Sequence, residues 1–167
     1  MELMLSQVLS IICHREKTRK GGEIMLISSR GQYAIRILLD LAIHEDGGEA
    51  INVKTIAQRQ ELSEKYMEQI LSVLQKAGFV ISTRGYHGGY HLSGKPENYS
   101  VGKILRTVDG PLIPANQQTS GENKPVDLVV NELWVNLQDK IEKTLDDVTL
   151  LDLMNSYNEK LCFNYMI

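Results

Sequence analysis

The chain has 167 residues, of which 43% are hydrophobic and 23% charged, and its formal net charge is −3. This composition is typical of a globular protein and excludes a largely disordered chain, and no apolar run reaches the roughly 18 residues that a membrane-spanning helix needs. The two cysteines, Cys13 and Cys162, lie near opposite ends of the chain, which argues against a disulfide framework or a structural zinc site and fits a reducing cytoplasm.

Residues 1–24 are interpreted as an N-terminal extension in which an apolar opening precedes a basic run. A secretory signal has the reverse order, so the extension does not predict export. Two interpretations stay open for it. The codons for residues 20–23 (KGGE) can spell a purine-rich ribosome-binding site just before Met25, which predicts that translation starts at Met25 and that the extension is a gene-calling artefact. Alternatively, the extension is a real, weakly ordered arm.

Apolar residues at three-and-four spacing predict an amphipathic helix over residues 29–45. Asn52 is expected to cap a short second helix, and Ser63 a third helix that ends just before Gly78. The face opposite the apolar stripe of this third helix is polar. Two short helices joined by a tight turn, the second with a polar face, indicate a helix-turn-helix.

A β-rich run, residues 79–83, follows this pair of helices directly. A glycine-rich connection over residues 84–89 leads to residues 90–92, which can return as a second strand. A hairpin in this place is the wing of a winged helix-turn-helix. We therefore expect a mainly α fold, with a winged helix-turn-helix DNA-binding domain in residues 25–95.

The second half, residues 96–157, is expected to form a dimerisation region, followed by an aromatic tail in residues 158–167. Ser100 can cap a helix, residues 109–127 form a turn-rich loop, and a long helix follows to about residue 146. Thr149 and Asp152 resemble a capping box for a last short helix. The long helix carries an apolar stripe near a heptad seam, which predicts a dimer interface, with packing inside one chain as the alternative. The interface residues are Val130, Trp134, Leu137 and Ile141.

From residue 25 to about residue 157 the chain resembles the Rrf-two (Rrf2) family of bacterial transcription regulators. The matching segments are residues 27–34, 62–70, 76–80, 101–104, 109–111 and 132–134. The most specific match is Arg84-Gly85 followed by Gly88-Gly89-Tyr90 in the wing. The resemblance implies a homodimer that binds double-stranded DNA, and a twofold dimer predicts an inverted-repeat operator.

Many members of this family hold an iron–sulfur cluster through three cysteines in the loop before the long helix. Residues 109–130 contain no cysteine here, and Gln32 and Asn131 stand where some members offer a further ligand. Cluster iron needs thiolates or imidazoles, so we expect no cluster and no other cofactor. The chain further resembles the cluster-free CymR type, repressors of cysteine metabolism, in residues 109–111 and 148–153 and in its aromatic tail. That likeness implies cysteine synthase as a partner that carries the sulfur signal.

The polar face of the third helix supplies the candidate base-reading residues. They are Lys65, Glu68, Gln69 and Ser72. An α-helix fits the major groove, where Gln can pair with adenine and Glu can accept from cytosine, whereas Lys65 is expected to meet a phosphate. The alternative for all four is an ordinary solvated helix face.

Two further groups of candidate DNA-binding residues flank this helix in the sequence. They are Arg84, Tyr86 and His87 in the wing and Ser28, Arg30 and Tyr33 at the start of the first helix. An arginine at a hairpin tip can enter a narrow minor groove, where the negative potential is strongest, and donors at a helix start suit a phosphate. The alternatives are solvated loop residues and plain helix capping.

Charge is divided unevenly between the two halves of the chain. Residues 25–95 carry eight basic and seven acidic residues, whereas residues 96–167 carry six basic and eleven acidic ones. This charge distribution leaves open that the chain is a protein-interaction module of the same fold with little DNA affinity. A second alternative is an iron–sulfur or redox sensor of the same family. No nucleophile–base arrangement indicates an enzyme, and the histidines have no partners at metal-ligand spacing.

Overall fold

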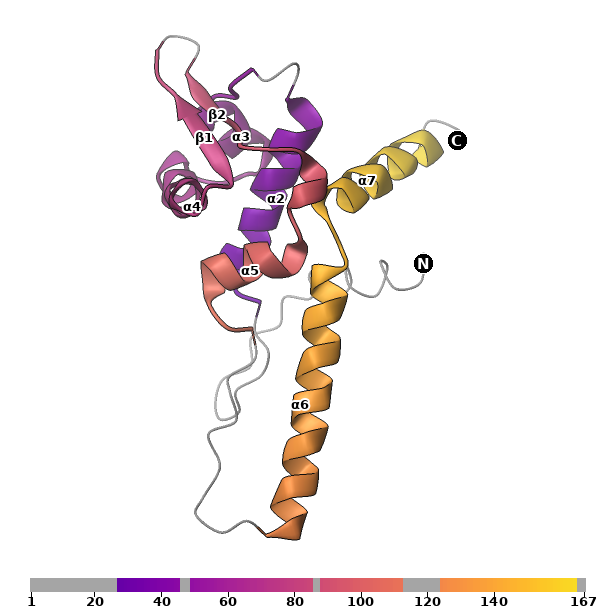
Figure 1. Ribbon diagram of the computed structural model, residues 1–167. Coiled ribbons are helices and arrows are strands. Elements are labelled where there is room, and N and C mark those ends of the chain that lie inside the picture. The colour runs from indigo at the N-terminus through magenta and orange to yellow at the C-terminus, as the bar shows by residue number, and fades with distance from the viewer. Residues whose placement is uncertain (1–26, 46–48, 86–87, 113–123, 165–167) are drawn as a thin grey trace.

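The computed structural model describes residues 27–45, 49–85, 88–112 and 124–164. Its elements in chain order are α2 (Ser29–His44), α3 (Val53–Arg59), α4 (Glu64–Lys76), β1 (Val80–Thr83), β2 (Gly89–Leu92), the 3-10 helix η1 (Pro96–Asn98), α5 (Val101–Asp109), α6 (Pro125–Asp146) and α7 (Leu150–Asn164). The expected mainly α winged helix-turn-helix with a long C-terminal helix is confirmed. Figure 1 shows the other elements gathered at one end of the molecule, with α6 extending away from them.

Helices α2, α3, α4 and α5 each begin at a side chain that accepts from an otherwise unpaired amide of the first turn. The capping residues are Ser28, Asn52, Ser63 and Ser100. Before α7, the Thr149 N–H donates to the Asp152 carboxylate at 2.8 Å, and the Asp152 N–H donates to the Thr149 hydroxyl at 3.2 Å. The caps predicted at Asn52, Ser63 and Ser100 and the capping box are therefore confirmed. The last helix is longer than predicted, because no glycine or proline interrupts residues 150–164.

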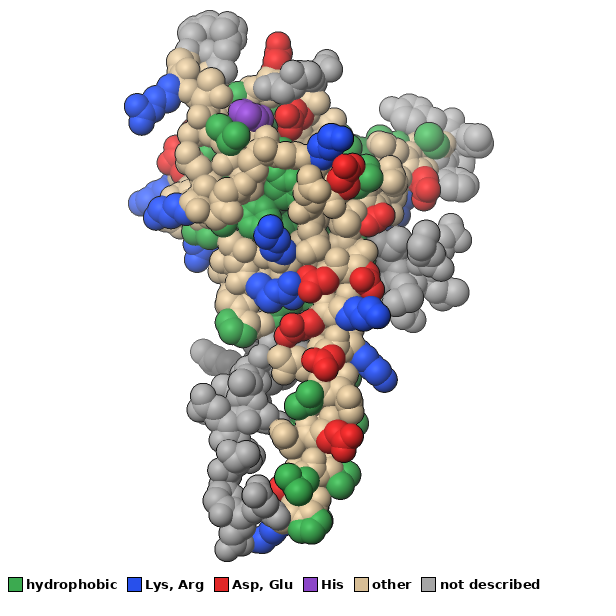
Figure 2. Space-filling model, in the orientation of Figure 1, with side chains coloured by type: hydrophobic (Ala, Val, Ile, Leu, Met, Phe, Trp, Pro, Cys, Tyr) green, Lys and Arg blue, Asp and Glu red, His purple; other side chains and the backbone are tan. Residues whose placement is uncertain are grey.

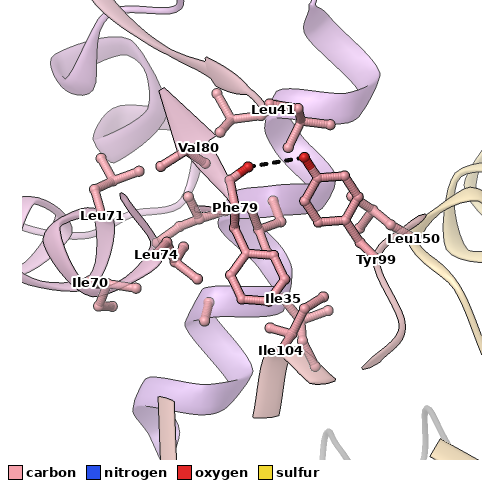
Figure 3. Close-up of a cluster of buried hydrophobic side chains, with 14 of the residues drawn as sticks. Ile35, Leu41, Ile70, Leu71, Leu74, Phe79, Val80, Tyr99, Ile104 and Leu150 are labelled. Carbon is pink, nitrogen blue, oxygen red and sulfur yellow. Dashed lines mark hydrogen bonds between the residues drawn. The ribbon is translucent and has the colours of Figure 1, made fainter. Parts of the chain in front are cut away.

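One hydrophobic core joins the two halves of the sequence. Phe79, which precedes β1, packs against Tyr99, which precedes α5, with 5.6 Å between ring centroids, and the Tyr99 hydroxyl donates to the Phe79 carbonyl at 3.1 Å. Figure 3 shows this pair among buried side chains of α2, α4, α5 and α7, including Leu150. The first turns of α5 and α7 thus belong to the same core as the helix-turn-helix.

The turn between α3 and α4 and the wing both depend on special backbone positions. Glu61 adopts a positive φ of 54° in the turn, and Gly78 one of 78° just after α4. Strands β1 and β2 pair antiparallel, and Ile51 adds a bridge to Tyr90. A Cβ on Gly89 would lie 2.2 Å from the Ile51 carbonyl oxygen, so only glycine permits this approach.

Helix α6 touches the rest of the described chain chiefly at its C-terminal end. Leu145 is its one buried residue, and the guanidinium of Arg106 in α5 lies 2.6 Å from the Asp146 carboxylate. A Cβ on Gly102 would lie 2.2 Å from that same carboxylate. Figure 2 shows acidic side chains on the part of α6 near the body and hydrophobic ones toward its free end. Within the described ranges, no helix is both long and apolar enough to cross a membrane.

A candidate nucleic-acid interface

An open hollow of about 660 Å³ lies between the start of α2 and the outer face of α4. Its lining residues are Arg30, Lys65, Tyr66, Glu68, Gln69 and Ser72. Five of these six belong to α4, whose opposite face is buried through Met67, Ile70, Leu71 and Leu74. The structure therefore brings the four residues predicted on this helix together with Arg30 from a different helix.

The side chains of the hollow offer the chemistry that a nucleic acid needs. Lys65 and Arg30 are exposed cations that can neutralise phosphates, while Gln69 offers an amide and Glu68 a carboxylate to base edges. Figure 2 shows Lys and Arg side chains along the edge of the molecule where α4 lies. Since the buried face anchors the helix, the polar face stands free for a ligand.

Tyr66 lines this hollow, although the sequence analysis did not single it out. It lies three residues before Gln69 and thus on the same helix face, which was the available signal. Tyr33, a predicted contact, is half-buried, and its ring meets the ring of Tyr66 edge to face with 5.9 Å between centroids. The guanidinium of Arg36 lies 5.6 Å from the centroid of the Tyr33 ring. Tyr33 therefore contacts a residue of the hollow without lining it, and a DNA contact from Tyr33 remains a prediction.

Ser28 has contacts of a different kind from Arg30. Its hydroxyl accepts from the Gly31 N–H at 3.0 Å and donates to the Asp109 carboxylate at 2.5 Å, and its own N–H donates to the same carboxylate at 3.0 Å. These are the contacts of a helix cap, which was the alternative considered for this residue. A phosphate contact from Ser28 remains a prediction, and it would have to coexist with these bonds.

The wing carries Arg84 directly after the end of β1. Arg84 is exposed, and the next residue, Gly85, has a φ of 120°. The Gly88 N–H donates to the Gly85 carbonyl at 2.9 Å where the chain returns toward β2. Tyr86 and His87, the other two wing residues predicted to bind DNA, lie outside the described residues. Figure 1 shows that the hairpin projects from the body on the side of α4.

A buried ion pair holds the helix-turn-helix on α2. The Asp40 side chain is only 3% exposed and accepts from the Arg59 guanidinium through Nε at 2.9 Å and Nη2 at 2.5 Å. The Gln60 amide also donates to Asp40 at 3.0 Å, and Arg36 donates to Gln60 at 3.1 Å. The end of α3 is thereby fixed against α2. The sequence carries no local signal for this network, because Asp40 lies 19 or 20 positions from these two donors and meets them only through the packing of α3 on α2.

Three of the four predicted dimer residues are exposed on α6, and the fourth packs against the core. Val130, Trp134 and Leu137 are 44%, 47% and 43% exposed, while Ile141 is half-buried against the core. Other large apolar residues of the same helix are also exposed, namely Val126, Leu128, Val129, Leu133 and Val135. Burying such side chains is favourable, so this helix presents a surface suited to a protein partner.

Comparisons with known proteins agree with this architecture. The model of the Rrf2 family, described as an iron-dependent transcriptional regulator, matches residues 27–156. The transcriptional regulator CymR of Bacillus subtilis is 38% identical over 129 residues, which are 77% of this chain and 89% of CymR. The solved structure of CymR, the global cysteine regulator of B. subtilis, has a TM-score of 0.68 at 35% identity and covers 80% of this chain and 98% of that one.

A second type of regulator is similar to a comparable degree. IscR of Aliivibrio salmonicida is 35% identical over 131 residues, which are 78% of this chain and 77% of that protein. The structure of T. potens IscR has a TM-score of 0.66 at 35% identity and covers 84% of this chain and 91% of that one. These relatives are transcriptional regulators, and none of them is an enzyme.

The residues present do not fit an iron–sulfur cluster, although the family description mentions iron. Such clusters are bound mainly by cysteine thiolates, and residues 109–130 contain neither cysteine nor histidine. Cys162 is exposed on α7. In the described part of the chain, no three His, Cys, Asp or Glu side chains gather in a group that could bind a metal.

Proposed function

The chain belongs to the Rrf2 family of transcriptional regulators, and we propose that it is a cytoplasmic repressor. It would bind an inverted-repeat operator as a homodimer, without an iron–sulfur cluster. The observation that carries the proposal is the hollow along α4, where Arg30 and Lys65 stand beside Gln69. Arg30 of α2 and Lys65 of α4 can bind phosphates, and the Gln69 amide beside them can bind a base edge.

We infer that α4 enters the major groove. There the Gln69 amide would pair with an adenine and the Glu68 carboxylate would accept from a cytosine amino group. Arg30 and Lys65 would contact phosphates on either side of the groove. Arg84, carried forward by the wing, would enter the neighbouring minor groove. This arrangement assigns the sequence-specific contacts to α4 and the main electrostatic contacts to the residues around it.

The homodimer would form through the exposed apolar stripe of α6. A second copy of the chain offers the same stripe, and a twofold axis lets Trp134 and Leu137 pack against their own equivalents. The pair would present two α4 helices to successive turns of one DNA face. This symmetry is the reason that we propose an inverted-repeat operator.

The test of this function is a gel shift of the full chain on the DNA upstream of its own gene. The wild-type protein is expected to bind tightly, with an affinity that falls steeply as salt rises. Arg84→Ala should weaken binding, whereas Lys160→Ala, which removes an exposed cation on α7, should not. Absence of specific binding would overturn the proposal and favour the interaction module, for which the near-balanced charge of residues 25–95 speaks.

The similarity to CymR supports a narrower proposal, that the genes controlled belong to cysteine metabolism and that cysteine synthase is a partner. The support is the likeness to a global cysteine regulator and the CymR-type segments of the sequence. A pull-down from extracts grown at low and high cysteine tests it. Recovery of cysteine synthase in a cysteine-dependent manner is the expected result, and its absence under both conditions would contradict the partnership.

A further inference from the structure

The carboxylate of Asp109 is bound to the first turn of a helix that lies 81 positions earlier in the chain. It accepts from the Ser28 N–H at 3.0 Å through Oδ2 and from the Ser28 hydroxyl at 2.5 Å through Oδ1. Asp109 is the last residue of α5 and Ser28 is the cap of α2. A carboxylate at a helix N-terminus satisfies free amides and interacts favourably with the helix dipole.

The end of α5 and the first turn of α2 are also in close steric contact. A Cβ added to Gly31 would lie 2.4 Å from Oδ2 of Asp109 and 3.0 Å from a methyl carbon of Leu105. No side chain therefore fits between the end of α5 and the first turn of α2. The position of that turn is fixed by hydrogen bonds to Ser28 and by direct contact at Gly31.

Arg30 lies between Ser28 and Gly31 in the sequence. Its side chain is exposed and lines the hollow beside Lys65 and Tyr66. The backbone that carries Arg30 thus belongs to the turn that Asp109 holds. A shift of that turn would move the guanidinium relative to α4.

We propose that Asp109 is a positioning residue for DNA binding, which fixes the first turn of α2 so that Arg30 meets a backbone phosphate beside the groove that α4 enters. This inference rests on the proposed function. It assigns to the end of α5, outside the helix-turn-helix, a direct influence on the affinity for DNA. Asp109 itself does not line the hollow and acts only through Arg30.

A purely stabilising role for Asp109 is the competing explanation, and the chain contains a matched control. Asp152 accepts from the Thr149 N–H at 2.8 Å and from the Thr149 hydroxyl at 2.6 Å. It therefore accepts from the same two kinds of donor at the start of α7, both through Oδ2, and it does not line the hollow. Loss of either carboxylate should lower the melting temperature, but only the loss of Asp109 should affect DNA.

The experiment measures the Kd of the full chain for a labelled duplex from its own upstream region, by fluorescence anisotropy at several salt concentrations and well below the melting temperature. Asp109→Asn is expected to raise Kd about tenfold, in the range found for coupled contacts. It should also make the negative slope of log K against log salt shallower by about 0.9, the value for one lost phosphate contact. Asp152→Asn should change neither quantity.

A double-variant cycle separates positioning from general weakening. If Asp109 acts through Arg30, the double variant Asp109→Asn/Arg30→Ala should bind no more weakly than Arg30→Ala alone. Full additivity of the two effects on Kd would overturn the proposal, and so would an unchanged Kd for a folded Asp109→Asn variant. In both cases, DNA binding by the wild-type chain would still support the proposed function as a DNA-binding regulator. Failure of the wild-type chain to bind would overturn both. Should Asp109→Asn not fold, Gly31→Ala, whose added methyl group would meet the Asp109 carboxylate, serves in the same cycle with the same criteria.

Discussion

The ring of Tyr33 meets the ring of Tyr66 edge to face, with 5.9 Å between centroids and 89° between ring planes. This pair joins the half-buried side of α2 to the exposed hollow along α4. Of the two rings, only that of Tyr66 lines the hollow, while that of Tyr33 packs against it. Substitutions at the two positions should therefore have different consequences.

Tyr33→Leu should lower the free energy of unfolding by about 1 kcal/mol, because it removes an aromatic pair. Tyr66→Phe keeps both rings and should leave stability unchanged, while it weakens DNA binding severalfold by removing a hydroxyl from the hollow. Urea denaturation and anisotropy titrations check the two effects. Equal DNA affinity for Tyr66→Phe and the wild-type chain would show that the hydroxyl does not contact DNA.

Arg59→Ala should be among the more damaging single substitutions in the helix-turn-helix. It leaves the Asp40 carboxylate, whose side chain is 3% exposed, without its guanidinium partner, and such a loss costs about 3 kcal/mol or more. Arg36→Ala removes a more exposed partner of the same network and should cost less than about 1 kcal/mol. Thermal unfolding compares the two variants, and a milder effect for Arg59→Ala than for Arg36→Ala would contradict this account.

Gly89→Ala should disrupt the wing, because the added methyl group would meet the backbone carbonyl of Ile51 rather than a movable side chain. We expect a loss of about 2 kcal/mol in stability, the range of overpacked sites. Gly94→Ala is the matched control, since its nearest neighbour would be the Tyr99 hydroxyl at 3.6 Å. That variant should stay within about 0.5 kcal/mol of the wild-type chain, as measured by urea denaturation.

Leu137→Glu should convert the proposed dimer into a monomer, because it places a charge in the apolar stripe of α6. Val135 is similarly exposed, at 49% against 43% for Leu137. It lies about 200° away around the helix, so Val135→Glu should leave the dimer intact. Sedimentation velocity distinguishes the two. A monomer from Val135→Glu and a dimer from Leu137→Glu would place the interface on the opposite face.

The helix caps and helix ends predicted correctly from the sequence are set by neighbours within about four positions. Ser63 caps α4 through the amide of Tyr66 three residues later, and Gly78 ends the same helix with its own positive φ. The bonds from Asp109 to Ser28 span 81 positions, and no local pattern marks them. Asp109 was noticed only as part of a family segment, because its role depends on how α5 packs on α2.

The candidate site was predictable to the extent that one helix supplies it. The polar face of α4 follows from helical spacing, and Arg30 was identified as a donor near a helix start. Their meeting in one hollow depends on the crossing of α2 and α4, which packing decides. The ring support of Tyr66 by Tyr33 is likewise a product of that crossing, so periodicity alone could not identify it.

Helix α5 is held by a carboxylate against a glycine at each end. In its first turn Gly102 meets Asp146 of α6, and in its last turn Asp109 meets Gly31 of α2. Because both ends of this short helix are in close contact, α5 fixes the distance between the proposed dimer helix, α6, and α2, which carries Arg30 of the proposed DNA-binding face. The distance between the two reading faces of a dimer would then be a property of the fold, so an operator with its half-sites moved apart by a few base pairs should be bound poorly rather than accommodated.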